Sequence, residues 1–163
     1  MSVVLLNTPS RQQLKEVETH VDAYGAFLDA LYNLKTPNFL ALQNELAHSD
    51  LTFAEGQAST DLDGALRYIA RWSAATDNLG RDHRTTELAY STDGTRMVCL
   101  DYLTVTQTGP VKLLNGKSID PGDRNRTLQL RNAHFIRLAD DGSHKIVEWR
   151  ISHNPRDFYD RLR

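Results

Sequence analysis

Residues 126–154 read RTLQLRNAHFIRLADDGSHKIVEWRISHN and carry the clearest structural pattern in this 163-residue sequence. Two runs in which apolar and polar residues alternate flank the tetrapeptide Asp140-Asp141-Gly142-Ser143. Alternation with a period of two is typical of strands with one buried face, and Asp and Gly both adopt the backbone conformations that tight turns require. The stretch therefore predicts a β-hairpin, and the other elements can be placed around it.

Each strand of this hairpin has an apolar face that ends in, or is interrupted by, polar residues. On the first strand, Asn132 and His134 have the same parity as four aliphatic residues, which are Leu128, Leu130, Ile136 and Leu138. On the second strand, the apolar face ends at His153 and consists of Val147, Trp149 and Ile151. Polar groups on an apolar face either find partners inside the core or line a pocket.

The first half of the chain shows helical periodicity. Ser10 is suited to cap a helix over residues 11–34, in which apolar residues recur at steps of three and four. A second helix is expected over residues 36–48, with a proline in its first turn. Either Asp61 or Asp63 can cap a third helix. Three helices thus precede most of the predicted strands.

Strand periodicity begins with residues 51–55 and returns in the second half of the chain. Residues 84–91 and 95–106 flank the turn sequence Thr-Asp-Gly at 92–94, which predicts a second hairpin. Helices followed by an antiparallel meander favour an α+β fold with the helices on one face of the sheet. A strongly curved antiparallel or mixed sheet wrapped around the three N-terminal helices would form a cone-shaped barrel. Its mouth is a favoured place for a small-molecule site.

The sequence is expected to form a single domain over residues 1–163, because nothing in it suggests a boundary. Residues 1–9 are expected to form a loose arm, and Pro155 to begin a short C-terminal helix. The connection over residues 107–125 contains three turn signals with glycine, which predict a flexible excursion. Connections of this length are often lids or binding loops, so we treat this one as a candidate lid.

The composition argues against several classes of function. The 19 basic and 21 acidic residues give a net charge of -2 without a basic face, so binding to nucleic acid is not expected. The only cysteine, Cys99, excludes an internal disulfide and a cysteine-based zinc site and indicates a reducing compartment. The apolar run Val3–Leu6 is too short for a signal peptide or a membrane span. A soluble cytoplasmic protein without membrane association is expected.

The spacing of ligand-type residues gives no support for a bound metal or cofactor. The histidines are not spaced to gather on one face as metal ligands, and no zinc motif is present. The glycines at 109, 116 and 122 are too far apart for a phosphate-binding loop. We therefore expect neither a metal nor a cofactor.

Residues 145–150 (KIVEWR), followed by Asn154-Pro155, and residues 51–55 (LTFAE), followed by 64–66 (GAL), carry a family resemblance. Both segments resemble the nuclear transport factor 2-like superfamily, especially its SnoaL-like polyketide cyclase and limonene-epoxide hydrolase-like branches. The resemblance extends over nearly the whole chain. It implies a cone-shaped α+β fold and is more specific for fold than for reaction.

This chain lacks most of the residues that the epoxide hydrolases of that branch use for catalysis. Asp101 matches the first aspartate of the pattern, but Cys99 stands where an arginine is expected and Ile151 where a second aspartate is expected. Phe53 and Glu55 occupy the positions of the residues that hold the hydrolytic water. Water activation between two carboxylates is therefore disfavoured, although the pocket itself is expected to persist.

Three residues are candidates for general acid–base chemistry. Asp101 lies on the apolar face of its strand, where burial disfavours the charged form and would let the carboxyl group donate a proton, unless backbone amides or an arginine satisfy it. Glu55 lies where related isomerases place a carboxylate base, although a solvated acid is the simpler interpretation. His134 could transfer protons or bind a substrate oxygen, or it could be a satisfied core histidine.

These observations suggest a cofactor-independent isomerase, cyclase or dehydratase of secondary metabolism that acts on a hydrophobic small molecule. Glu55 would be the base, while Asp101 with His134 would supply a proton or bind a developing oxyanion. The expected substrate contacts are Asn132, Phe27, Phe53, Trp72, Leu103, Trp149 and Ile151. The alternative is a non-catalytic module that binds a small molecule or a protein in the same cone. Epoxide hydrolysis is a weaker third hypothesis.

The same resemblance implies a homodimer, because sheets of this family commonly pair across their outer faces. Tyr102, Phe135 and Arg137 have the parity expected of that outer face. Tyr90 is likewise predicted to point outward or toward a dimer partner.

Overall fold

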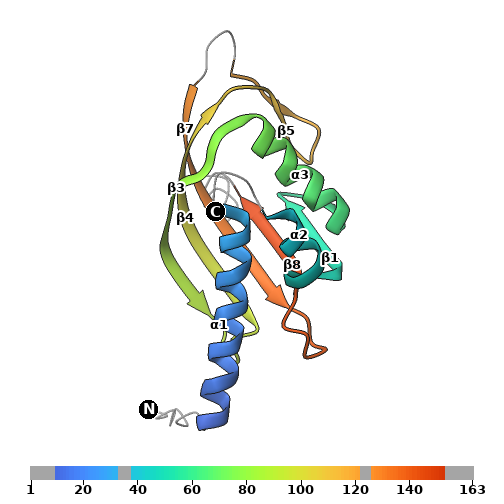
Figure 1. The fold of residues 1–163 in the computed structure, drawn as a ribbon, viewed down its shortest axis with the longest axis vertical. Coiled ribbons are helices and arrows are strands. Elements are labelled where there is room, and N and C mark those ends of the chain that lie inside the picture. The colour runs from blue at the N-terminus through green and yellow to red at the C-terminus, as the bar shows by residue number, and fades with distance from the viewer. Residues whose placement is uncertain (1–9, 33–37, 122–125, 153–163) are drawn as a thin grey trace, which may run out of the picture.

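The computed structural model describes residues 10–32, 38–121 and 126–152 (Figure 1). The expected N-terminal arm, the helix from Pro155, part of the candidate lid, and the residues His153 and Asn154 lie outside these ranges. In the described part, the helices lie over one face of a curved sheet (Figure 1). This is the α+β arrangement predicted from the order of helices and strands.

Helix α1 spans Arg11–Tyr32 and begins with reciprocal hydrogen bonds between Ser10 and Gln13. The Ser10 hydroxyl accepts from the Gln13 amide at 3.2 Å, and the Gln13 side chain accepts from the Ser10 amide at 2.7 Å. Such a capping box satisfies two backbone donors that the helix leaves unpaired, which confirms the predicted cap. The short helix α2, Phe39–Ala41, continues directly into the π-helix η1, Leu42–Leu46.

Helix α3, Leu62–Ala74, is capped by Asp61, whose carboxylate accepts a hydrogen bond from the Gly64 amide at 2.9 Å. Of the two candidate caps, Asp61 is therefore the correct one. A side chain at Gly64 would overlap Thr60, the last residue of strand β2, Ala58–Thr60. The first turn of α3 thus packs directly against this strand.

Six strands form one mixed sheet in the order β2-β1-β8-β7-β4-β3. Besides β2, they are β1 Ala47–Glu55, β3 Thr76–Tyr90, β4 Arg96–Gln107, β7 Arg126–Leu138 and β8 Ile146–Ser152. Strands β1 and β8 are parallel, and the other neighbours are antiparallel. In the described sheet the edge strands β2 and β3 do not pair with each other, and closure into a barrel would require that pairing. The predicted barrel is therefore wrong, and the cone-like sheet is open.

Both predicted hairpins are present. The β7–β8 turn has Gly142 at a φ of 78° and His144 at 55°, and the β3–β4 turn has Gly94 at 71°. Glycine enters this left-handed region without steric cost, which explains why the two Asp-Gly sequences mark the turns. The two hairpins join β3 to β4 and β7 to β8, while β4 and β7 pair along their whole length.

The concave face of the sheet carries the core, as the alternation of the strands predicts. On β4, every second residue is buried, which gives the set Met97, Cys99, Asp101, Leu103, Val105 and Gln107. On β7, the buried set is Asn132, His134, Ile136 and Leu138. Helices α1 and α3 cover this face with Tyr24, Phe27, Leu31, Tyr68, Ile69 and Trp72. The polar exceptions noted in the sequence are therefore true interior residues.

Tyr90 lies on the face of the sheet that α1 covers, although it is 37% exposed, so its expected outward direction does not hold. It pairs with the buried Met97, and its ring centroid lies 6.0 Å from that of Tyr24. The reason is an irregularity in β3 between Thr85 and Glu87, where the register shifts by one residue. An extra residue in one strand moves all later side chains to the opposite face, so parity counted along the sequence fails beyond it.

The connection after β4 contains a small second sheet where a structureless excursion was expected. Strand β5, Val111–Lys112, pairs with β6, Ser118–Ile119. Val111 is fully buried, and the Gln107 side-chain amide donates to the carbonyls of Gly109 and Ile119 at 2.9 and 2.7 Å. The buried valine and this amide hold the connection against the domain up to β6.

Candidate active site

Asp101 and His134 form a hydrogen-bonded pair inside the concave face. In the β4–β7 register, Asp101 lies opposite Asn132 and Cys99 lies opposite His134, so the pair is diagonal. The distance from His134 Nε2 to Asp101 Oδ2 is 3.0 Å, and both side chains are 0% exposed. A carboxyl group and an imidazole removed entirely from water are costly to bury, which makes this pair the most unusual feature of the described core.

Tyr32, the last residue of α1, adds a phenol group to this pair. Its hydroxyl oxygen lies 3.0 Å from His134 Nε2, and the residue is 8% exposed. Burial raises the pKa of Tyr32 well above its ordinary value of 10.0, the negative charge of Asp101 adds to the increase, and a hydrogen bond from Asn132 opposes it. Tyr32, Asp101, Asn132 and His134 thus make one buried polar cluster. Sequence reasoning missed Tyr32, because its position depends on where α1 ends above the sheet.

Trp149 on β8 completes the polar cluster. Its indole Nε1 donates a hydrogen bond to His134 Nδ1 at 3.0 Å. The same side chain packs edge-on against Phe27, with ring centroids 5.4 Å apart, and tilted against Phe53 at 4.3 Å. Trp149 was predicted only as an apolar wall, whereas it is also a hydrogen-bond donor to the cluster.

Glu55 lies at the end of β1 and belongs to a neighbouring hydrogen-bond group. Tyr68 of α3 donates to Glu55 Oε1 at 2.6 Å, and the Leu114 backbone amide donates to Oε2 at 2.8 Å. Burial and the charge of Glu55 raise the pKa of Tyr68 above its ordinary value. The described contacts therefore bring Asp101 and His134 together as predicted, and they hold Glu55 by Tyr68 and by the connection after β4.

Phe53 lies between the two groups of polar residues. Its ring centroid is 4.9 Å from that of Tyr68 and 4.3 Å from that of Trp149. The residues predicted to line an apolar wall are all at most 6% exposed, and they are Phe27, Phe53, Trp72, Leu103, Trp149 and Ile151. The interior next to the cluster is therefore apolar and aromatic, which would strengthen electrostatic interactions made within it.

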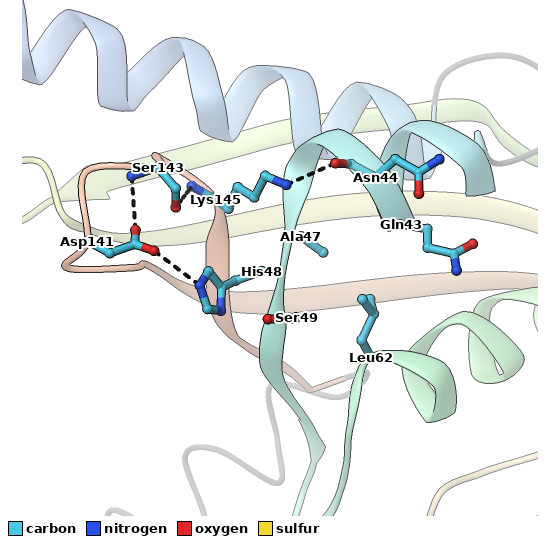
Figure 2. A pocket seen from close by; sticks show the side chains of 9 residues that line it. All are labelled: Gln43, Asn44, Ala47, His48, Ser49, Leu62, Asp141, Ser143 and Lys145. Carbon is cyan, nitrogen blue, oxygen red and sulfur yellow. Dashed lines mark hydrogen bonds and ion pairs between the residues drawn. The ribbon is translucent and has the colours of Figure 1, made fainter.

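A surface hollow of about 460 Å³ lies elsewhere, between η1, the start of β1 and the β7–β8 turn (Figure 2). Two contacts cross this hollow: His48 contacts Asp141 at 3.2 Å, and Lys145 donates to the backbone carbonyl of Asn44 at 2.9 Å. Hydrogen bonds from Ser143 and the contact with His48 lower the pKa of Asp141 to about 2. These contacts tie the turn of the hairpin to the first strand, and we assign them a structural role.

A second hollow, of about 280 Å³, lies on α3 beside Arg67, Ala70 and Arg71.

Within residues 10–32, 38–121 and 126–152, no group of three or more His, Cys, Asp or Glu side chains is placed to hold a metal ion. No helix among these residues has the length and apolar character needed to cross a membrane.

No protein family and no curated protein matches this chain in sequence. Solved structures do match in fold. A SnoaL-like polyketide cyclase from Agrobacterium tumefaciens is 16% identical, with a TM-score of 0.58 over 88% of this chain and 98% of that one. An epoxide hydrolase of the limonene-epoxide hydrolase-like type from M. tuberculosis is 15% identical, with a TM-score of 0.57 over 89% and 90%.

A protein from Shewanella denitrificans that is assigned as a SnoaL-like polyketide cyclase gives a TM-score of 0.62 at 11% identity, over 88% of this chain and 96% of that one. The names of these structures are those of the two branches that the sequence resembles. The chain therefore has the nuclear transport factor 2-like fold. Because the sequence identities are so low, the structural similarity supports a shared fold and does not show an activity.

Proposed function

We propose that this protein is a cofactor-independent enzyme that isomerises, cyclises or dehydrates a largely apolar small molecule by general acid–base catalysis. The observation that supports this most strongly is the fully buried contact between Asp101 and His134, with Tyr32 on the same imidazole nitrogen. Ionisable groups that are buried, charge-coupled and surrounded by aromatic side chains are typical of active sites. SnoaL-like polyketide cyclases among the structural neighbours are consistent with such chemistry.

In this proposal Glu55 is the general base. Tyr68 and the Leu114 amide both donate to Glu55, and hydrogen bonds of this kind favour the ionised form that a base requires. Tyr32, and Asp101 in its protonated form, lie on the other side of Phe53 and Trp149 and would supply a proton or hydrogen-bond a developing oxyanion. Asn132 and the apolar residues around Phe53 would contact the substrate and exclude water. The connection over residues 107–125 would act as a lid, anchored at Leu114.

The experiment that tests this function follows the removal of a proton from carbon, whatever product the natural substrate gives. A panel of apolar cyclic ketones is incubated with the protein in D₂O, and exchange of carbon-bound hydrogen is followed by proton NMR. We expect protein-dependent exchange with at least one ketone, and we expect Glu55→Gln and Asp101→Asn to slow it by at least about tenfold without loss of fold. Unchanged rates in both variants would remove the proposed site.

A non-catalytic binding module is the second candidate. The direct ring contacts among Phe27, Phe53 and Trp149 favour it, because they fill part of the space that a substrate would need. Saturable binding of an apolar ligand without any hydrogen exchange would support this alternative. Epoxide hydrolysis remains the weakest hypothesis, since Cys99 and Ile151 stand where that chemistry would need an arginine and an aspartate.

We also propose that two copies of the chain pair through the convex face of the sheet, and that the protein acts in the cytoplasm. Val98 and Tyr102 are 44% and 37% exposed on that face. The guanidinium carbon of Arg131 lies 4.9 Å from the centroid of the Tyr102 ring, so apolar and charged side chains lie side by side on this face. Light scattering at micromolar concentration is expected to give the mass of a dimer, and a monomer would contradict this part of the proposal.

A further inference from the structure

The hydrogen bond between Trp149 and His134 indicates which ring nitrogen of His134 is protonated. An indole N–H can only donate, so the nitrogen that it contacts must present a lone pair. That nitrogen is His134 Nδ1, at 3.0 Å from Trp149 Nε1. The two ring planes are nearly parallel, 11° apart, with centroids 6.1 Å apart, which is compatible with an N–H directed at the lone pair of the other ring. Nδ1 therefore carries no proton.

We propose that Trp149 is a positioning residue that holds His134 as a neutral imidazole with its single proton on Nε2. This proton faces two oxygen atoms, Asp101 Oδ2 and Tyr32 Oη, each 3.0 Å from Nε2. His134 thus donates a hydrogen bond to the cluster and does not act as its base. The part that this plays in catalysis rests on the proposed function, whereas the tautomer itself does not.

The alternative protonation state is strongly disfavoured by the surroundings. A proton on Nδ1 would bring two N–H groups face to face at 3.0 Å, where His134 is 0% and Trp149 3% exposed. Because no bulk water reaches this position, neither group could turn to another solvent partner without moving the core. The indole N–H therefore disfavours both forms of His134 that carry a proton on Nδ1, which are the imidazolium and the Nδ1-protonated neutral tautomer.

Among the described residues, the titratable groups that face His134 are Tyr32 from α1 and Asp101 and Cys99 from β4, while β8 contributes the non-titrating Trp149. Burial raises the pKa of Cys99 to about 11 and that of Tyr32 well above 10.0, with Asp101 adding to both increases. Both groups therefore keep their protons near neutral pH. With His134 held neutral, proton exchange with a substrate in this cluster is left to Asp101 and Tyr32.

NMR of the protein labelled with ¹⁵N at histidine tests the inference directly. Two-bond ¹H–¹⁵N correlations distinguish the two neutral tautomers from the imidazolium. Near neutral pH we expect His134 to show the pattern of the Nε2-protonated neutral form. An Nδ1-protonated pattern or an imidazolium pattern would overturn the proposal.

Trp149→Phe supplies the matched perturbation, because it removes the indole N–H and keeps an aromatic ring in the core. We expect the Nδ1-protonated tautomer or the imidazolium to appear in the His134 spectrum of this variant, because no N–H then requires a lone pair on Nδ1. Trp72→Phe is the control: it removes an indole beside Tyr68, with ring centroids 6.5 Å apart, and should leave the His134 spectrum unchanged. A His134 spectrum in Trp149→Phe identical to the wild-type one would contradict the positioning role.

Should Trp149→Phe fail to fold, the wild-type spectrum still decides whether the tautomer is as proposed. The test of the tautomer and the test of the proposed function can fail independently. If no ketone exchanges hydrogen, the enzyme hypothesis is wrong, and the tautomer is unaffected. If His134 carries its proton on Nδ1 while exchange is normal, the positioning role is wrong, and the enzyme hypothesis is unaffected.

Discussion

Two histidine–aspartate pairs of nearly equal length lie in opposite surroundings in this protein. His134 and Asp101 are 3.0 Å apart with both side chains 0% exposed, whereas His48 and Asp141 are 3.2 Å apart with side chains 22% and 52% exposed. An exposed pair of this kind contributes little to stability, because water and salt screen it. A buried pair must first overcome the loss of hydration. Distance alone therefore does not indicate which pair has a function, and burial with converging partners does.

The partners of the two pairs differ as well. His48 Nδ1 accepts a hydrogen bond from the Asp50 amide. Its Nε2 contacts Asp141, so the ring links strand β1 to the β7–β8 turn (Figure 2). His134 Nδ1 accepts from Trp149, and its Nε2 faces Asp101 and Tyr32. The exposed pair is bonded to backbone and turn residues, and the buried pair is bonded to side chains that can transfer or donate protons.

The largest expected difference between the pairs concerns stability. Asp101→Ala removes the acceptor of a fully buried imidazole and should lower the free energy of unfolding by about 3 kcal/mol. Asp141→Ala removes an exposed partner and should move the urea midpoint much less. Chemical denaturation of both variants measures this difference. Equal midpoints in the two variants would show that burial does not distinguish the pairs.

A smaller effect is expected from Tyr32→Phe, which removes only the hydroxyl 3.0 Å from His134 Nε2. The ring and its burial remain, so the fold should be kept, while hydrogen exchange of a reactive ketone should slow by at least about tenfold. Tyr24→Phe is the matched control, since that hydroxyl donates to the Gly94 carbonyl at 3.1 Å, outside the cluster. If both variants exchange at the wild-type rate, Tyr32 has no part in the reaction.

The smallest effect concerns acid. The folded-state pKa of Asp141 is about 2 against an ordinary value of 3.8, so the folded chain binds fewer protons than the unfolded chain between these values. The stabilisation is present above about pH 4 and is lost as the pH falls toward 2. In Asp141→Asn, this part of the acid dependence of the thermal midpoint should disappear. An unchanged acid profile would contradict the role of the turn contacts.

Much of the fold could be predicted from local sequence, because its signals are local in origin. The caps at Ser10 and Asp61, the two glycine turns and the alternation on β4 and β7 each depend on residues close together in the chain. Two features could not be predicted this way. The irregularity within β3 reverses the face of Tyr90, and whether the edge strands meet depends on the curvature of the entire sheet.

The candidate site was predictable only in part. Asp101, Asn132 and His134 were noticeable as polar residues at core positions of predicted strands, and the register of β4 and β7 brings them together. Tyr32 and Tyr68 carried no such signal, because an aromatic residue on a helix is normal in a core. The partners of Glu55 depend on a backbone amide at Leu114, 59 residues further along the chain, which local patterns do not report.

The most direct measurement is a crystal structure with an apolar ketone that undergoes hydrogen exchange. The ligand is expected beside Phe53, with its oxygen within hydrogen-bond distance of Tyr32 or Asp101 and a carbon-bound hydrogen facing Glu55. A ligand bound instead in the hollow next to His48 and Asp141, with the buried cluster unchanged, would contradict the account.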